Sequence, residues 1–140
     1  MLQSIIFITS LLTISSTTQF KVSSCGSSTD LMQNVVLFVS PALPQTDYIL
    51  YLNGDLNNTV TQGTSTYDIT YNFIPFSPYT NDLCTEINTS NITCPLQVGH
   101  LSSESKGSIA NDVSGTVTIK NQWFNENNQR ILCMLFNIKI

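Results

Sequence analysis

The chain has 140 residues, of which 10% are charged, and its 5 Lys and Arg against 9 Asp and Glu give a formal net charge of −4. With 41% hydrophobic residues, the composition is typical of one compact domain and excludes a disordered or fibrous chain. Binding to nucleic-acid phosphates needs clustered Lys and Arg, and the few scattered cations here exclude nucleic acid as a partner.

Residues 1–18 are predicted to be a cleaved signal peptide. They carry no charged side chain and include an apolar stretch over residues 5–14. Thr9 and Ser10 interrupt this stretch, which is too short for a membrane-spanning helix. We therefore expect one mature domain over residues 19–140, located outside the cytosol.

Beyond the leader, apolar side chains recur at every second position, between clusters of Gly, Pro, Asn and Asp. This period is typical of short, half-buried strands, and no stretch keeps helical spacing. The predicted strands, in chain order, are residues 31–39, 48–56, 66–74, 93–98, 116–124 and 131–140. Six or seven such strands with no helix between them predict an all-β fold, a two-sheet antiparallel β-sandwich.

The last two strands carry the clearest pattern. Large side chains share one face of each strand: Val117, Ile119, Asn121 and Trp123 on the first, and Met134, Phe136, Ile138 and Ile140 on the second. Both faces are expected to point to a common interior. The pattern does not distinguish a filled core from the wall of a cavity.

Four cysteines allow three disulfide pairings. Cys84 and Cys94 are ten residues apart, so a local bond between them is the economical choice and leaves Cys25 to join Cys133. Zinc is the rival interpretation, but the sequence has no Cys-x-x-Cys and a single His, so we expect no metal site.

Three glycosylation sequons begin at Asn57, Asn88 and Asn91. Each is weak evidence alone, because Asn, Ser and Thr are abundant in this chain. Together with the leader and the even number of cysteines, they support a protein that enters the secretory pathway.

The cysteines and prolines form a recognisable pattern. Cys25-Gly26 lies near the mature start, Ser40-Pro41 ends the first long strand, and Cys94-Pro95-Leu96-Gln97 precedes Trp123 and Cys133. From about residue 24 to residue 140 this arrangement resembles the ML (MD-2-related lipid-recognition) family. Within that family it is most similar to the Niemann-Pick type C2 and phosphatidylglycerol/phosphatidylinositol transfer branch.

The resemblance implies an immunoglobulin-like sandwich whose sheets are splayed around an apolar cavity for a sterol or phospholipid. It implies no catalytic residue and no cofactor. It also implies a monomer, secreted or resident in the lysosomal or endosomal lumen, that transiently contacts a membrane surface or a membrane lipid-transport protein.

The family's lipid-binding positions map onto seven residues of this chain. Phe76 corresponds to an aromatic residue at the cavity mouth, and Ala110 and Ser114 to two further mouth positions. The inward wall corresponds to Trp123, Met134, Phe136 and Ile138. Residues 42–47 lack the Cys of the family's short disulfide, and Ala110 and Ser114 are small, so the resemblance implies the lipid class and not the species.

The segment around Phe76 is also predicted to dock at a bilayer. Phe73, Ile74, Phe76 and Tyr79 lie there among two prolines. The alternative is a Pro-rich loop folded over the core.

Three other functions fit the sequence less well. An enzyme is not expected, because His100 with Glu104 and Asp82 with Glu86 are the nearest approach to a catalytic pair, and solvated surface side chains explain both. A filled-core adhesion sandwich would place its Trp differently relative to the cysteines. A glycolipid-presenting accessory subunit would carry basic residues at the mouth, and none are evident.

Overall fold

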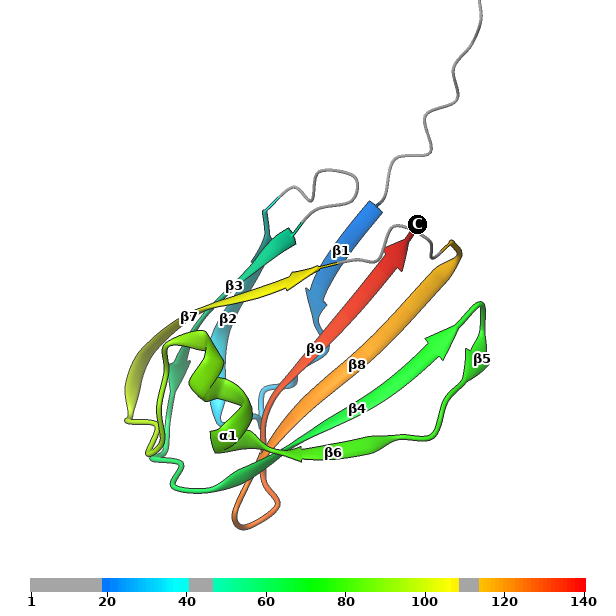
Figure 1. The fold of residues 1–140 in the computed structure, drawn as a ribbon. Coiled ribbons are helices and arrows are strands. Elements are labelled where there is room, and N and C mark those ends of the chain that lie inside the picture. Colours follow the sequence, from blue (N-terminus) through cyan, green and yellow to red (C-terminus); the bar gives the residue numbers. More distant parts are fainter. Residues whose placement is uncertain (1–18, 41–46, 109–113) are drawn as a thin grey trace, which may run out of the picture.

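The computed structural model describes residues 19–40, 47–108 and 114–140, so the predicted signal peptide lies outside it. These residues form nine strands, one α-helix and one 3₁₀ helix, arranged as two antiparallel sheets (Figure 1). In chain order the elements are β1 (Gln19–Ser24), β2 (Met32–Val39), β3 (Asp47–Leu56), β4 (Gly63–Tyr71), β5 (Ile74–Pro75), β6 (Tyr79–Asp82), α1 (Leu83–Ile87), η1 (Asn88–Ser90), β7 (Gly99–Ser108), β8 (Thr116–Asn125) and β9 (Arg130–Lys139). The predicted all-β, immunoglobulin-like sandwich is confirmed.

The larger sheet has the strand order β1-β9-β8-β4-β5, with β6 also paired to β4, and the smaller sheet has the order β2-β3-β7. The β8–β9 hairpin places Ile119 opposite Phe136 and Asn121 opposite Met134. Since side chains alternate between the faces of a strand, these four share one face of the larger sheet. As predicted, that face points to the interior.

The hydrophobic core fills one end of the sandwich. It is made by the last part of β3, the first parts of β2, β7 and β9, and helix α1, which packs against β4 and is followed by η1, which contacts β7 (Figure 1). Its most buried members are Met32, Leu52, Leu56, Val60, Leu83, Ile87, Leu96, Ile131 and Leu132, each at most 2% exposed. Toward the opposite ends of the same strands this close packing stops.

Four of the six predicted strands are confirmed within a residue or two, and two predictions need correction. The strand predicted at 66–74 is β4, which begins earlier, at Gly63. The strand predicted at 93–98 is wrong, because this segment contributes one isolated bridge, between Leu96 and Val60. Pro95 lacks the amide hydrogen that a strand interior would use.

The strand that pairs with β3 is β7, which the hydrophobic pattern did not indicate. Its inward positions are Leu101, Ser103, Ser105 and Gly107, so only one of them is apolar and bulky. Gly107 has a packing reason, because a Cβ atom there would lie 2.5 Å from the ring of Tyr48. A strand whose inner face is small and polar carries no period-two hydrophobic signal.

Helix α1 was also not predicted, although its sequence holds a helix-start signal. Asp82 is the N-cap, and its carboxylate accepts hydrogen bonds from the amide (2.9 Å) and hydroxyl (2.8 Å) of Thr85. These bonds hold the pKa of the Asp82 carboxyl below its usual range. Leu83 and Ile87, four residues apart, share the buried side of the helix.

Both disulfides have the pairing favoured from the sequence, Cys25–Cys133 and Cys84–Cys94. The first attaches the segment between β1 and β2 to β9. Beside it, the buried carboxylate of Asp30 accepts a 2.8 Å hydrogen bond from Arg130 Nε and a 3.1 Å hydrogen bond from the amide of Ser27. The disulfide and this ion pair therefore secure the same end of β9.

Candidate functional site

A cavity of about 720 Å³ lies between the two sheets, beyond the end of the packed core. Its size falls within the usual range of small-molecule pockets, about 300–1,000 Å³. The larger sheet contributes Ile119, Asn121, Trp123, Met134, Phe136 and Ile138 to its wall, and the smaller sheet contributes Tyr48 and Leu50. These parts of the wall are therefore mainly apolar and aromatic.

All four residues predicted for the inward wall line this cavity: Trp123, Met134, Phe136 and Ile138. Trp123 also belongs to the core cluster, so it marks the boundary between the packed end and the open end. Leu132, two residues before Met134 on the same face of β9, lies in the core and not at the cavity.

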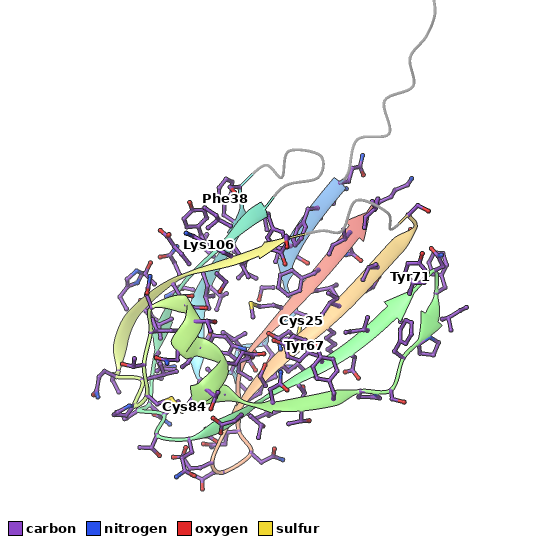
Figure 2. All side chains as sticks on the ribbon, in the orientation of Figure 1. Cys25, Phe38, Tyr67, Tyr71, Cys84 and Lys106 are labelled. Atoms are coloured by element: carbon purple, nitrogen blue, oxygen red, sulfur yellow. A yellow bond between two sulfur atoms is a disulfide. The ribbon has the colours of Figure 1, made fainter. Side chains whose placement is uncertain are left out.

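None of the three predicted mouth residues is found at the cavity: two lie away from it, and one is outside the described residues. Phe76 is 55% exposed and follows β5, at the edge of the larger sheet, and it does not line the cavity. Ser114 is exposed, and its carbonyl accepts a hydrogen bond from the hydroxyl of Tyr71, at the β5 end of β4 (Figure 2). Ala110 lies outside the described residues.

Three aromatic residues that the sequence did not single out complete the wall. Phe20 of β1 packs against Tyr48, with ring centroids 4.6 Å apart, and edge-on against Phe136 at 6.1 Å. Tyr67 of β4 lines the side toward α1 and stacks on Tyr79, with centroids 4.8 Å apart. Phe20 alternates with polar neighbours in residues 19–22, a short period-two signal that could have identified β1.

The amide side chain of Asn121, at the floor of the cavity, has its polar atoms satisfied. Its Nδ2 donates to Ser65 Oγ at 2.8 Å and to the carbonyl of Thr66 at 3.0 Å, and its Oδ1 accepts from Trp123 Nε1 at 3.2 Å. Because both the amide and the indole are paired within the protein, the floor of the cavity does not need water to satisfy them. An apolar guest can therefore cover this floor without breaking a hydrogen bond.

The rim toward α1 and β7 is polar. It includes Glu86 of α1, residues 89–91 at η1, and residues 104–106 of β7. Glu86 accepts hydrogen bonds from the hydroxyl of Tyr67 and from Asn81 Nδ2, which ties α1 to β4 and to β6 (Figure 2 labels Tyr67). The cavity thus joins an apolar interior to a hydrophilic opening.

The phenols of the wall stay neutral at physiological pH. Burial, reinforced by the hydrogen bond to Glu86, raises the pKa of Tyr67 well above its ordinary value of 10.0. Burial also raises the pKa of Tyr48. Neither group therefore brings a charge into the apolar interior.

Three of the four residues considered as catalytic pairs, His100, Asp82 and Glu86, make the following side-chain contacts. His100 lies 3.3 Å from Asp55 on β3, away from the cavity, and both side chains are exposed. Hydrogen bonds from Asn34 and His100 hold the pKa of Asp55 below its usual range. Asp82 caps α1, and Glu86 binds Tyr67 and Asn81.

Across residues 19–40, 47–108 and 114–140, no helix is long and apolar enough to cross a membrane. The same ranges contain no cluster of three or more His, Cys, Asp or Glu side chains suited to a metal ion.

Comparisons with known proteins agree with this architecture. A family model described as the ML domain matches residues 19–140. A search of curated protein sequences finds no match. Chicken MD-1, in its crystal structure complexed with lipid IVa, is similar with a TM-score of 0.65 and 16% identity, over 89% of this chain and 91% of that one. A Niemann-Pick type C2 protein from the Japanese carpenter ant is similar with a TM-score of 0.60 and 14% identity, over 84% of this chain and 96% of that one.

Proposed function

The chain belongs to the ML domain family, and we propose that it binds a sterol or a phospholipid in the cavity between its sheets and carries it between membranes. The observation that supports this most directly is the contrast along β9. Ile131 and Leu132 pack in a closed core, Met134 belongs to that core and also lines the cavity, and Phe136 and Ile138 face about 720 Å³ of space between the sheets. Such space, bounded by large apolar side chains, suits an apolar guest.

The energetics favour a hydrocarbon guest. A lipid that leaves a membrane exposes its apolar surface to water at about 0.8 kcal/mol per methylene group. The wall around Trp123 and Phe136 offers equivalent apolar surroundings, and the amide of Asn121 is already paired. The tail is therefore expected to lie against β8 and β9, with the polar group at the rim.

The charges at the rim favour some headgroups over others. Glu86 and Glu104 carry two carboxylates, and Lys106 carries one ammonium group. This balance disfavours a strongly anionic headgroup at the opening, since like charges would lie close together. We therefore propose a sterol or a zwitterionic phospholipid ahead of phosphatidylglycerol or phosphatidylinositol.

Mass spectrometry of an organic extract from the purified protein tests the proposal directly. A reproducible co-purified lipid, displaced by added sterol or phosphatidylcholine, is the expected result. Absence of any extractable lipid, together with no uptake of fluorescent sterol or phospholipid, would instead favour a recognition sandwich without a lipid cargo.

Filling the cavity is expected to weaken lipid binding. In Ile119→Trp the larger side chain occupies space equivalent to roughly two methylene groups, so at about 0.8 kcal/mol each the Kd should rise about tenfold. The matched control is Lys120→Trp, the next residue of β8, which is exposed on the other face. Fluorescent-lipid titration should show the increase for Ile119→Trp alone. Equal affinities for both variants would place the ligand elsewhere.

For transfer, we propose that the protein contacts membranes through an apolar tip made of Phe73, Ile74, Phe76 and Tyr79. These side chains are 87%, 65%, 55% and 46% exposed. Phe73 has a left-handed backbone (φ 67°), unusual for a bulky residue. Its neighbour Asn72 holds the turn in place with two hydrogen bonds to Thr116. The backbone N–H of Asn72 donates to the carbonyl of Thr116 at 2.8 Å, and Asn72 Oδ1 accepts from the backbone N–H of Thr116 at 2.9 Å.

The tip is adjacent to the cavity through one aromatic pair. Tyr79 of the tip stacks on Tyr67, and Tyr67 lines the cavity. Residues 69–81 carry no charged side chain. A bilayer can therefore receive the tip without burying a charge.

The double variant Phe73→Ser, Ile74→Ser is expected to slow vesicle-to-vesicle lipid transfer about tenfold or more, because each removed side chain loses about 1.5–3 kcal/mol of apolar burial in the bilayer. Its stability and its lipid affinity should not change, since both side chains are exposed in solution. The control is Val98→Ser, which removes an equally apolar side chain, 59% exposed, next to the start of β7. Transfer rates that fall equally in both proteins would show that the tip has no special role.

A further inference from the structure

Two of the three sequons lie in the segment that borders the cavity opening. Asn88 is the first residue of η1, and Asn91 directly follows η1 in a left-handed conformation (φ 61°). Asn57, Asn88 and Asn91 are all exposed, so each can carry a glycan in the folded protein. Of these three, Asn91 alone lines the cavity.

The position of Asn91 at the rim is secured from three sides. The preceding residue, Ser90, is buried, and its hydroxyl lies 2.7 Å from that of Ser105 on β7. Ile87, at the end of α1, is 2% exposed in the core. The Cys84–Cys94 disulfide closes the whole segment into a short loop. A group attached to Asn91 therefore stays at the opening and cannot move away with a loose loop.

We propose that Asn91 carries an N-linked glycan that partly covers the cavity opening and slows the exchange of ligand. A glycan is bulky and strongly hydrated, and entering the apolar interior would cost it hydrogen bonds to water. It is therefore retained outside the wall formed by Trp123 and Phe136, in the path of a lipid that enters or leaves. The side chains of Asn57 and Asn88 do not line the cavity, so a glycan on either is expected to obstruct this path less.

The expected effect is kinetic. An obstacle at the opening hinders entry and exit alike, because both pass through the same transition state. The association and dissociation rate constants should therefore fall together, while the affinity stays nearly unchanged. This inference rests on the proposed lipid binding and on passage of the chain through the secretory pathway.

The test uses the full chain secreted from cultured eukaryotic cells. Glycopeptide mass spectrometry measures the occupancy of Asn91, and stopped-flow fluorescence measures uptake and release of a fluorescent sterol. Thr93→Ala removes the sequon, leaves Asn91 itself in place, and changes an exposed side chain. A second variant is Asn91→Asp, since Asp also tolerates a left-handed backbone. The matched control is Asn88→Asp, three residues away on the same segment.

We expect an occupied Asn91 in the unmodified protein. Both variants that lose this glycan should exchange sterol severalfold faster in both directions, and Asn88→Asp should keep the original rates. An unmodified Asn91 peptide, or rates that do not change when the glycan is lost, would overturn the inference while leaving lipid binding intact. Failure of every protein to take up sterol or phospholipid would instead contradict the proposed function itself.

Discussion

Replacing Cys25 and Cys133 together by alanine should lower the free energy of unfolding by about 5 kcal/mol, the largest effect expected for this protein. The bond joins residues 108 apart, and a loop of about 100 residues restricts the unfolded chain by roughly this amount. Cys133 is 1% exposed, so its replacement also disturbs close packing beside Leu132. Urea denaturation followed by tryptophan fluorescence measures the change, since Trp123 is the single Trp of the chain.

The second disulfide provides the comparison for this experiment. Cys84 and Cys94 are 10 residues apart, so their replacement by alanine should cost about 3 kcal/mol. The longer bond should therefore matter more. A larger loss of unfolding free energy for the shorter bond would mean that the Cys84–Cys94 disulfide stabilises α1 and η1 by more than loop closure.

Arg130→Met should destabilise the protein by about 3 kcal/mol, because it leaves the carboxylate of Asp30 buried without its cation. The two side chains are 25% and 4% exposed, and Arg130 Nε lies 2.8 Å from Asp30 Oδ1. Arg130 also donates to Gln122 Oε1 at 3.2 Å. Thermal and urea unfolding at neutral pH measure the loss.

A double variant separates two effects of Arg130→Met, the loss of its contact with Asp30 and the burial of an unpaired carboxylate. When Asp30→Asn is combined with Arg130→Met, neither partner is charged, and the amide oxygen introduced at position 30 can still accept from the amide of Ser27. We expect this double variant to be more stable than Arg130→Met alone. If it is less stable, the buried carboxylate is held by its hydrogen bonds from Ser27 and not by Arg130.

The hydrophobic pattern predicted most of the strands that bound the cavity, but it did not predict the cavity between them. β8 and β9 were predicted because every second position carries a large side chain, Ile119 and Trp123 in β8 and Phe136 and Ile138 in β9. β7 escaped notice because its inward side holds Ser103 and Ser105 and little bulk. The pattern reports side-chain size and polarity, and a sheet can use small side chains wherever its neighbour supplies the volume.

The sequence did not predict whether an inward residue of β9 lies in the packed core or lines the cavity. Leu132 and Ile138 are similar in size and share one face of β9. One packs among core residues and the other faces open space, because the distance to the smaller sheet differs at the two ends. That distance is set by the whole fold, and the size and face of a side chain do not report it. Phe76 was likewise predicted at the mouth of the cavity, but it lies at the outer edge of the larger sheet.

Because the cavity leaves one end of the sandwich without close packing, the stability of the fold would depend on whether a ligand is bound there. A guest in the cavity would supply the apolar contacts that the chain itself does not provide beyond Trp123, and it would bind the native state and not the unfolded one. At a free concentration one hundred times its Kd, such a guest adds about 2.7 kcal/mol of stability. Loaded molecules would then outlast empty ones against heat and proteases, so the amount of carrier would follow the supply of its cargo.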